Sequence, residues 1–200
     1  MKRAIAVVGL LALGGCAARR GVGGEIEGQG RQPEGYAARL AVWTQDDVLH
    51  DGFATVLRVR ATLLLDDVVD AMNAEAASWQ IDAVPMASPT TPTVVFSAAS
   101  ELDDLGFSTA DKPAAWQVGL LVDGQRCTLE ELTETKITAM THRLYPELSA
   151  WDRQWTARFS GCPVLGETQL QIVGAHGTLE FGWRVGGDSV VAMRRAPVRR

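Results

Sequence analysis

The strongest constraint on the fold is a period-two alternation of apolar and polar residues in short runs. In residues 55–64, for example, Leu57, Val59, Ala61 and Leu63 fall on one face of an extended chain. Residues two apart on a strand point to the same side, so this pattern predicts a strand with one buried face. Further strands are predicted at residues 39–44, 93–97, 116–122, 125–129, 135–141, 154–159, 169–172 and 179–185.

Glycine and proline separate these runs, and Asp123-Gly124 is typical of a hairpin turn. Short strands at such intervals, roughly ten to twenty residues apart, favour a mainly β fold. We expect an antiparallel β-sandwich that is immunoglobulin-like in general architecture. A regular alternation of strands and helices is missing, which argues against a parallel α/β sheet.

One segment changes period and predicts a single helix near residues 66–80. Val69, Met72, Ala76 and Trp79 recur at spacings of three and four, which places them on one helical stripe. Asp66 precedes this stripe and is the expected N-cap.

The N-terminus carries the pattern of an export signal. Lys2 and Arg3 precede an apolar stretch at residues 4–13, and Leu13-Gly14-Gly15-Cys16 follows. The apolar stretch is shorter than the roughly 20 residues that a membrane-spanning helix needs.

Leu13-Gly14-Gly15-Cys16 resembles the lipobox of bacterial lipoproteins. The resemblance implies cleavage between Gly15 and Cys16 and a diacylglyceryl group on the sulfur of Cys16. Ala17 occupies the position at which an aspartate retains such proteins in the inner membrane, so the resemblance implies the outer membrane. The alternative is an ordinary signal peptide cut near Ala17 or Ala18, which would leave a soluble periplasmic protein.

The expected organisation therefore has four parts: a signal peptide at 1–15, a lipidated cysteine and glycine-rich flexible tether at 16–36, a β-sandwich domain at 37–190, and a basic disordered tail at 191–200. The chain carries 19 basic and 24 acidic side chains, and cleavage would remove Lys2 and Arg3 from the basic set. A mildly acidic protein is a poor partner for nucleic acid or for anionic lipid surfaces.

Two cysteines remain once Cys16 is assigned to lipid. Cys127 and Cys162 are predicted to form a structural disulfide, because an exported protein meets an oxidising compartment. Two buried free thiols are the alternative, and a redox pair is disfavoured because the close C-x-x-C spacing is missing.

Residues that carry chemistry are scattered along the chain. His50, His142 and His176 each stand alone, whereas a metal site needs several converging ligands. Asp103-Asp104 could line a calcium loop but lacks the D-x-D-x-D-G spacing. The sequence contains no G-x-S-x-G elbow, P-loop or dinucleotide-binding motif. We therefore predict no catalytic residue, no metal site and no cofactor.

The tryptophans are the remaining candidates for recognition. Trp79, Trp155 and Trp183 fit buried faces, whereas the positions of Trp43, Trp116 and Trp151 are not determined by the pattern. Large aromatic side chains dominate binding surfaces when they are exposed. Trp43, Trp116, Tyr145 and Trp151 form the candidate binding surface, with core packing and a structural corner around Tyr145 as the alternatives.

These features predict a non-enzymatic, lipid-anchored protein of the outer membrane, facing the periplasm or the cell surface. Its sandwich domain would serve protein interaction or envelope structure, with an envelope protein as partner. A carbohydrate- or small-ligand-binding module is the first alternative, and an envelope hydrolase is the second.

Overall fold

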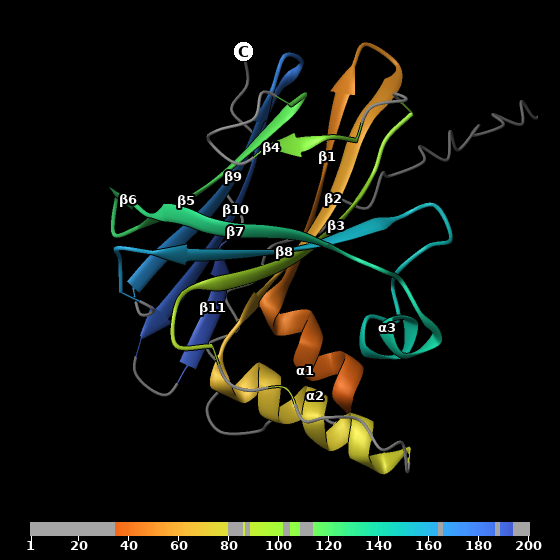
Figure 1. Cartoon of the computed structure of the whole chain (residues 1–200), viewed down its shortest axis with the longest axis vertical. Coiled ribbons are helices and arrows are strands. Elements are labelled where there is room, and N and C mark those ends of the chain that lie inside the picture. Colours follow the sequence, from red (N-terminus) through yellow and green to blue (C-terminus); the bar gives the residue numbers. More distant parts are fainter. Residues whose placement is uncertain are drawn as a thin grey trace, which may run out of the picture.

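The computed structural model describes residues 35–79, 86, 89–101, 105–108, 114–163, 166–186 and 189–193. The signal peptide, Cys16, nearly all of the tether, Asp103-Asp104 and residues 194–200 lie outside this part of the chain. The described residues form two sheets and three helices (Figure 1), so the predicted mainly β, antiparallel sandwich is confirmed.

The first sheet has five antiparallel strands in the order β1-β2-β3-β8-β7. Their bounds are β1 (Thr44–Asp51), β2 (Ala54–Leu64), β3 (Thr93–Ala99), β7 (Thr128–Thr135) and β8 (Arg153–Ser160). The strands turn steadily across the sheet, so that β1 and β2 are steep in Figure 1 while β7 and β8 run almost horizontally.

The second sheet follows the order β11-β10-β9-β5-β4, and β6 pairs with β5. Its strands are β4 (Phe107–Ser108), β5 (Trp116–Val122), β6 (Gln125–Arg126), β9 (Gly166–Gly174), β10 (Gly177–Gly186) and β11 (Ser189–Met193). The short β4 pairs with β5 in parallel, and the other pairs in this sheet are antiparallel. Pairing of β11 with β10 reaches Met193, so the folded domain extends past residue 190.

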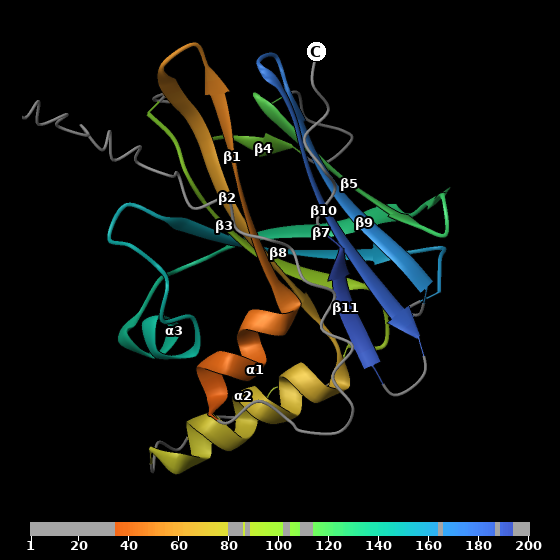
Figure 2. The same ribbon diagram turned by 180° about the vertical axis from the view of Figure 1, so that it is seen from behind.

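The three helices are α1 (Tyr36–Trp43), α2 (Asp66–Ser78) and α3 (Ala139–Leu144). They lie together toward the end of the first sheet that is remote from the β1–β2 hairpin, as Figures 1 and 2 show from opposite sides. The sequence patterns predict a single helix, whereas the described residues form three.

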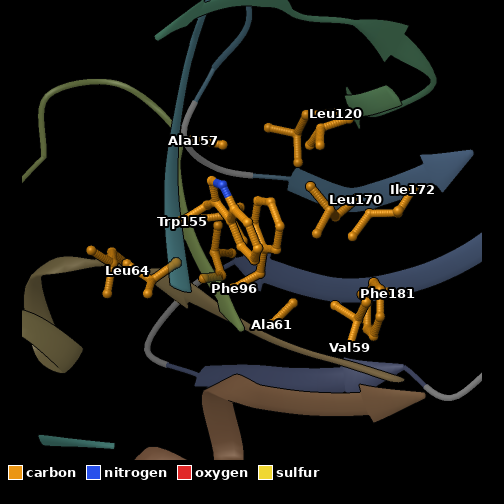
Figure 3. Packing of buried hydrophobic residues seen from close by; sticks show 14 of the residues in the cluster. Val59, Ala61, Leu64, Phe96, Leu120, Trp155, Ala157, Leu170, Ile172 and Phe181 are labelled. Carbon is orange, nitrogen blue, oxygen red and sulfur yellow. The ribbon is translucent and has the colours of Figure 1, made fainter. Parts of the chain in front are cut away.

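The core lies between the inner faces of the two sheets. Val59, Ala61, Phe96 and Trp155 from the first sheet face Leu120, Leu170, Ile172 and Phe181 from the second (Figure 3). Phe96 and Trp155 stack with ring centroids 5.6 Å apart. Burial of such side chains stabilises the fold by about 1.5–3 kcal/mol each.

The alternation in β2 is confirmed, since Leu57, Val59, Ala61 and Leu63 are all buried. The hairpin turn is confirmed as well: Asp123 has φ 49° and Gly124 has φ 79°, the two positive values that a type I′ turn requires.

The predicted helix near 66–80 is confirmed as α2, with Val69, Met72 and Ala76 buried on its stripe. Its N-cap is Leu65 rather than Asp66. Asp66 and Asp67 lie one step further on, in the first turn, where their charge still complements the positive end of the helix.

Three predicted strand segments differ from the structure. Residues 39–44 belong mostly to α1, because Tyr36, Leu40 and Trp43 recur at helical spacing and Leu40 and Trp43 are buried. Residues 135–141 leave β7 and enter α3, where Thr138 and Thr141 form a reciprocal capping box. Residues 125–129 divide at Cys127, and the chain passes there from the second sheet to the first.

The predicted disulfide between Cys127 and Cys162 is present, with the two Cα atoms 5.4 Å apart. Cys127 is the residue before β7, and Cys162 follows the end of β8 by two residues. The bridge therefore closes the open end of this strand pair, opposite the end that leads to α3.

Candidate binding site on the outer face of the first sheet

A row of polar side chains crosses the outer face of the first sheet. Asp46 pairs with Arg60, Arg60 with Ser97, and Ser97 with Gln154, which places one residue from each of β1, β2, β3 and β8 side by side. Directly paired residues of neighbouring strands point to the same side of a sheet. These four side chains therefore share one surface, opposite the apolar core.

A second row lies two residues along the strands. Thr44 pairs with Thr62 and Thr62 pairs with Val95. The hydroxyl oxygens of Thr44 and Thr62 are 2.8 Å apart and share a hydrogen bond. The two rows together form a polar floor with a small apolar area at Val95.

A pocket of about 380 Å³ lies on this floor. One wall is α1, which contributes Ala37, Leu40 and Ala41. The opposite wall is the segment of residues 145–148 that follows α3. The volume lies at the small end of the range of ligand pockets.

Two arginines of β2 hold the 145–152 segment over the sheet. Arg60 donates a 2.7 Å hydrogen bond to the backbone carbonyl of Glu147, and its guanidinium is 3.9 Å from the Glu147 carboxylate. Arg58 pairs with Asp152 at 3.1 Å. Asp152 is buried, and its second carboxylate oxygen accepts a 2.6 Å hydrogen bond from the backbone N–H of Ser149. The wall is thus held by two arginines on the outer face of the first sheet, Arg58 and Arg60.

Two tyrosines lie near the helical side of the pocket, and Tyr145 is one of its lining residues. The Tyr36 hydroxyl donates a 2.6 Å hydrogen bond to the carbonyl of Leu144, joining α1 to α3. Burial, and secondarily the charge of Glu75, raises the pKa of Tyr36 above its ordinary value. Burial, and secondarily Tyr36, raises the pKa of Tyr145 in the same way. Both side chains therefore stay neutral at any physiological pH.

Ser97 and Gln154 stand out because they are polar, buried and without protein partners. Their relative exposures are 6% and 3%, and both line the pocket. Neither side chain forms a hydrogen bond with any residue that the structure describes. The polar atoms of this adjacent pair are not among the fully buried groups that lack a hydrogen bond, so they reach the open pocket, where water or a ligand can bond them.

The tryptophans expected at the binding surface are not brought together. Trp43 and Trp116 are buried at 9% and 1% exposure, so neither is available to a partner. Trp151 is 85% exposed, and Tyr145 lines the pocket as a half-buried residue. Trp79 is half-buried beneath the guanidinium of Arg143, 5.2 Å from the ring centroid.

None of the three histidines lines the pocket. His50 and His142 are exposed, and His176 lies in the β9–β10 turn with Nδ1 3.3 Å from Asp51 in β1. Among the described residues, no group of three or more histidine, cysteine, aspartate or glutamate side chains is placed to hold a metal ion. Within the same residues, no helix combines the length and hydropathy needed to cross a bilayer.

Sequence reasoning did not identify Ser97, Gln154 or Arg60 as site residues. Gln154 and Arg60 both occupy the polar positions of alternating strands, which is the ordinary pattern of a solvated face. The only available indication was that Ser97 interrupts an otherwise apolar, β-branched run at residues 93–97.

The fold and the site together define an antiparallel β-sandwich with a small polar pocket between α1, the segment of residues 145–148 and the outer face of the first sheet. No protein-family model, curated protein or solved structure matches this chain at a significant level.

Proposed function

We propose that this protein is a non-catalytic, lipid-anchored outer-membrane protein that presents its sandwich domain to a protein partner in the cell envelope. Cys16 carries the anchor, and residues 16–36 hold the domain away from the lipid surface. The observation that carries the interaction part of the proposal is the exposure of Trp151 on a fixed loop.

Trp151 is exposed at 85%, whereas its neighbour Asp152 is only 8% exposed. The backbone N–H of Trp151 donates to the Ser149 hydroxyl at 3.3 Å, and that of Asp152 donates to the Ser149 carbonyl at the same distance. Arg58 holds Asp152 from the sheet below. The indole is therefore presented by a backbone that is already ordered.

A partner that covers this indole would bury a large apolar surface without having to order the loop. Tryptophan is enriched among the residues that carry most of the energy of protein interfaces. Ordering of loops is one of the main free-energy costs of association, and a fixed loop reduces it. These two effects favour a protein interface centred on Trp151.

Photo-crosslinking in living cells tests the interface. A photoreactive phenylalanine analogue at position 151 should give one discrete adduct with an envelope protein after illumination. The same analogue at Val173, which is 41% exposed on the other sheet, is the matched control and should give none. No adduct at 151, or the same adduct at both positions, would contradict the interface.

The anchor is tested separately. Cys16→Ser should release the protein from the membrane fraction, because several buried acyl chains contribute about 0.8 kcal/mol per methylene to membrane binding. Mass spectrometry of the wild-type protein should find an acylated Cys16 at the mature N-terminus. An unmodified N-terminus at any other residue would rule out the anchor while leaving the interface test intact.

A further inference from the structure

The pocket on the outer face of the first sheet has a chemistry that the protein-interaction proposal does not use. Its polar groups include hydrogen-bond acceptors, donors and groups that do both. The carboxylates of Asp46 and Glu147 accept, the guanidinium of Arg60 donates, and Ser97 and Gln154 do both. A ligand that satisfies this lining must offer donors and acceptors close together.

The hydrogen-bonding groups of the lining disfavour two classes of ligand. An anion only accepts hydrogen bonds and would face two carboxylates, Asp46 and Glu147. An ammonium ion only donates, so it could pair with the carboxylates but would leave the donor hydrogens of Ser97 and Gln154 without an acceptor. A hydroxyl group does both and adds no charge, so it suits each of these side chains.

The pair of Ser97 and Gln154 sharpens this conclusion. A carboxamide places one acceptor and two donor hydrogens in a plane, which matches two neighbouring hydroxyls of one ligand. Ser97 lies directly opposite Gln154 in the register of β3 and β8, so the two side chains share the same part of the floor. Because both residues lack protein partners within the described chain, their hydrogen-bonding groups are available.

The walls supply the apolar component. Ala37, Leu40 and Ala41 of α1 face the pocket from one side, and Pro146 and Leu148 face it from the other. Such surfaces fit the C–H groups of a sugar ring, whose edges carry the hydroxyls. We propose that the pocket binds a neutral, hydroxyl-rich small molecule of the size of a mono- or disaccharide.

Ligand-observed NMR on the purified full-length chain in detergent tests this proposal. The neutral probes are glucose, galactose, N-acetylglucosamine and maltose, and the charged probes are glycine, inorganic phosphate and choline. At least one neutral sugar should show saturable binding. Absence of binding by all four sugars, or binding by the charged probes alone, would overturn the proposal.

Variants locate the site. Gln154→Met should weaken sugar binding by about fivefold or more, the effect of losing one or two neutral hydrogen bonds. Gln117→Met is the matched control, because Gln117 is an exposed glutamine on β5 of the other sheet, and it should leave affinity unchanged. Equal affinity of the wild-type protein and Gln154→Met would overturn the assignment.

Two further variants keep the test decisive. Thermal unfolding shows whether Gln154→Met is folded. If it is not, Ser97→Ala replaces it, because it removes the other side chain without a protein partner and should weaken sugar binding in the same way. Trp151→Ala should retain sugar binding, so a failure of the pocket is distinguishable from a failure of the protein interface. Loss of sugar binding in Trp151→Ala with full retention in Ser97→Ala would place the ligand elsewhere and overturn the proposal.

Discussion

The indole N–H of Trp183 in β10 donates a 2.9 Å hydrogen bond to the backbone carbonyl of Trp43, the last residue of α1. The last carbonyls of a helix have no partner within the helix, and this one is satisfied by the opposite sheet. Gln45, two residues on, continues the connection, because its amide exchanges hydrogen bonds with the backbone N–H and carbonyl of Gly182. Side chains thus join β1 to β10 where the two sheets meet.

Trp183→Phe should lower the free energy of unfolding by about 1–3 kcal/mol, because it leaves the Trp43 carbonyl buried without a donor. Urea denaturation followed by circular dichroism measures this difference. Trp151→Phe is the control, since an exposed residue changes stability by no more than about 0.5 kcal/mol. Equal stabilities of the two variants would show that the hydrogen bond contributes little.

Removal of the disulfide by Cys127→Ala together with Cys162→Ala should lower the free energy of unfolding by about 4 kcal/mol. The two residues are 35 positions apart, and the bridge restricts a loop of that length in the unfolded chain. Denaturation with and without a reducing agent checks this. The reducing agent should destabilise the wild-type protein and have no effect on the double variant.

Gly174→Ala should destabilise the second sheet by about 1–3 kcal/mol through overpacking. A Cβ at this position would lie 2.4 Å from a ring carbon of Trp116, which is buried and cannot move aside. Gly119→Ala on the neighbouring strand is the control, because its nearest atom is 3.8 Å away at the end of Arg126. Similar melting temperatures of the two variants would argue against tight packing at Trp116.

Gln154→Met should raise the free energy of unfolding by about 1 kcal/mol in the absence of ligand. The substitution keeps the length of the side chain and removes a largely desolvated amide that reaches the pocket and has no protein partner among the described residues. A stability gain at the expense of binding is the usual behaviour of residues retained for function. Gln117→Met should stay within about 0.5 kcal/mol of the wild-type protein, and a destabilised Gln154→Met would indicate a structural role for the amide.

Acidification should weaken the outer edge of the first sheet. Hydrogen bonds from Arg153 hold the pKa of Glu134 below its ordinary value of 4.5. A hydrogen bond from Thr133, then one from Arg158, lowers the pKa of Glu131 likewise. A lowered folded-state pKa means that the stabilisation is complete above pH 4.5 and is lost as the pH falls through the lower folded value.

Glu134→Gln tests this dependence, because the variant should lose less stability than the wild-type protein between pH 6 and pH 3. The difference should be small, since both carboxylates are exposed and water screens their ion pairs. Identical pH dependence of the two proteins would show that the Arg153 pair contributes nothing measurable.

Local patterns in the sequence were sufficient for most of the elements. The period of two in β2 identified its buried face, the three-and-four spacing identified α2, and Asp123-Gly124 identified a turn. The pairing of Cys127 with Cys162 is predicted because Cys16 is assigned to lipid and an exported protein meets an oxidising compartment. The strand prediction for residues 39–44 is wrong because α1 has only eight residues, too few for a helical period to stand out from a β pattern.

The site depended on contacts between segments far apart in the chain. An alternation of period two indicates which residues share a face of a strand, but it does not indicate what covers that face. Ser97 and Gln154 became a pocket floor because α1 and residues 145–148 cover the outer side of β3 and β8. Trp43 lies on the buried stripe of α1 and Trp116 on the buried face of β5, and the packing of these faces against other elements removes both indoles from the surface, while Trp151 stays exposed.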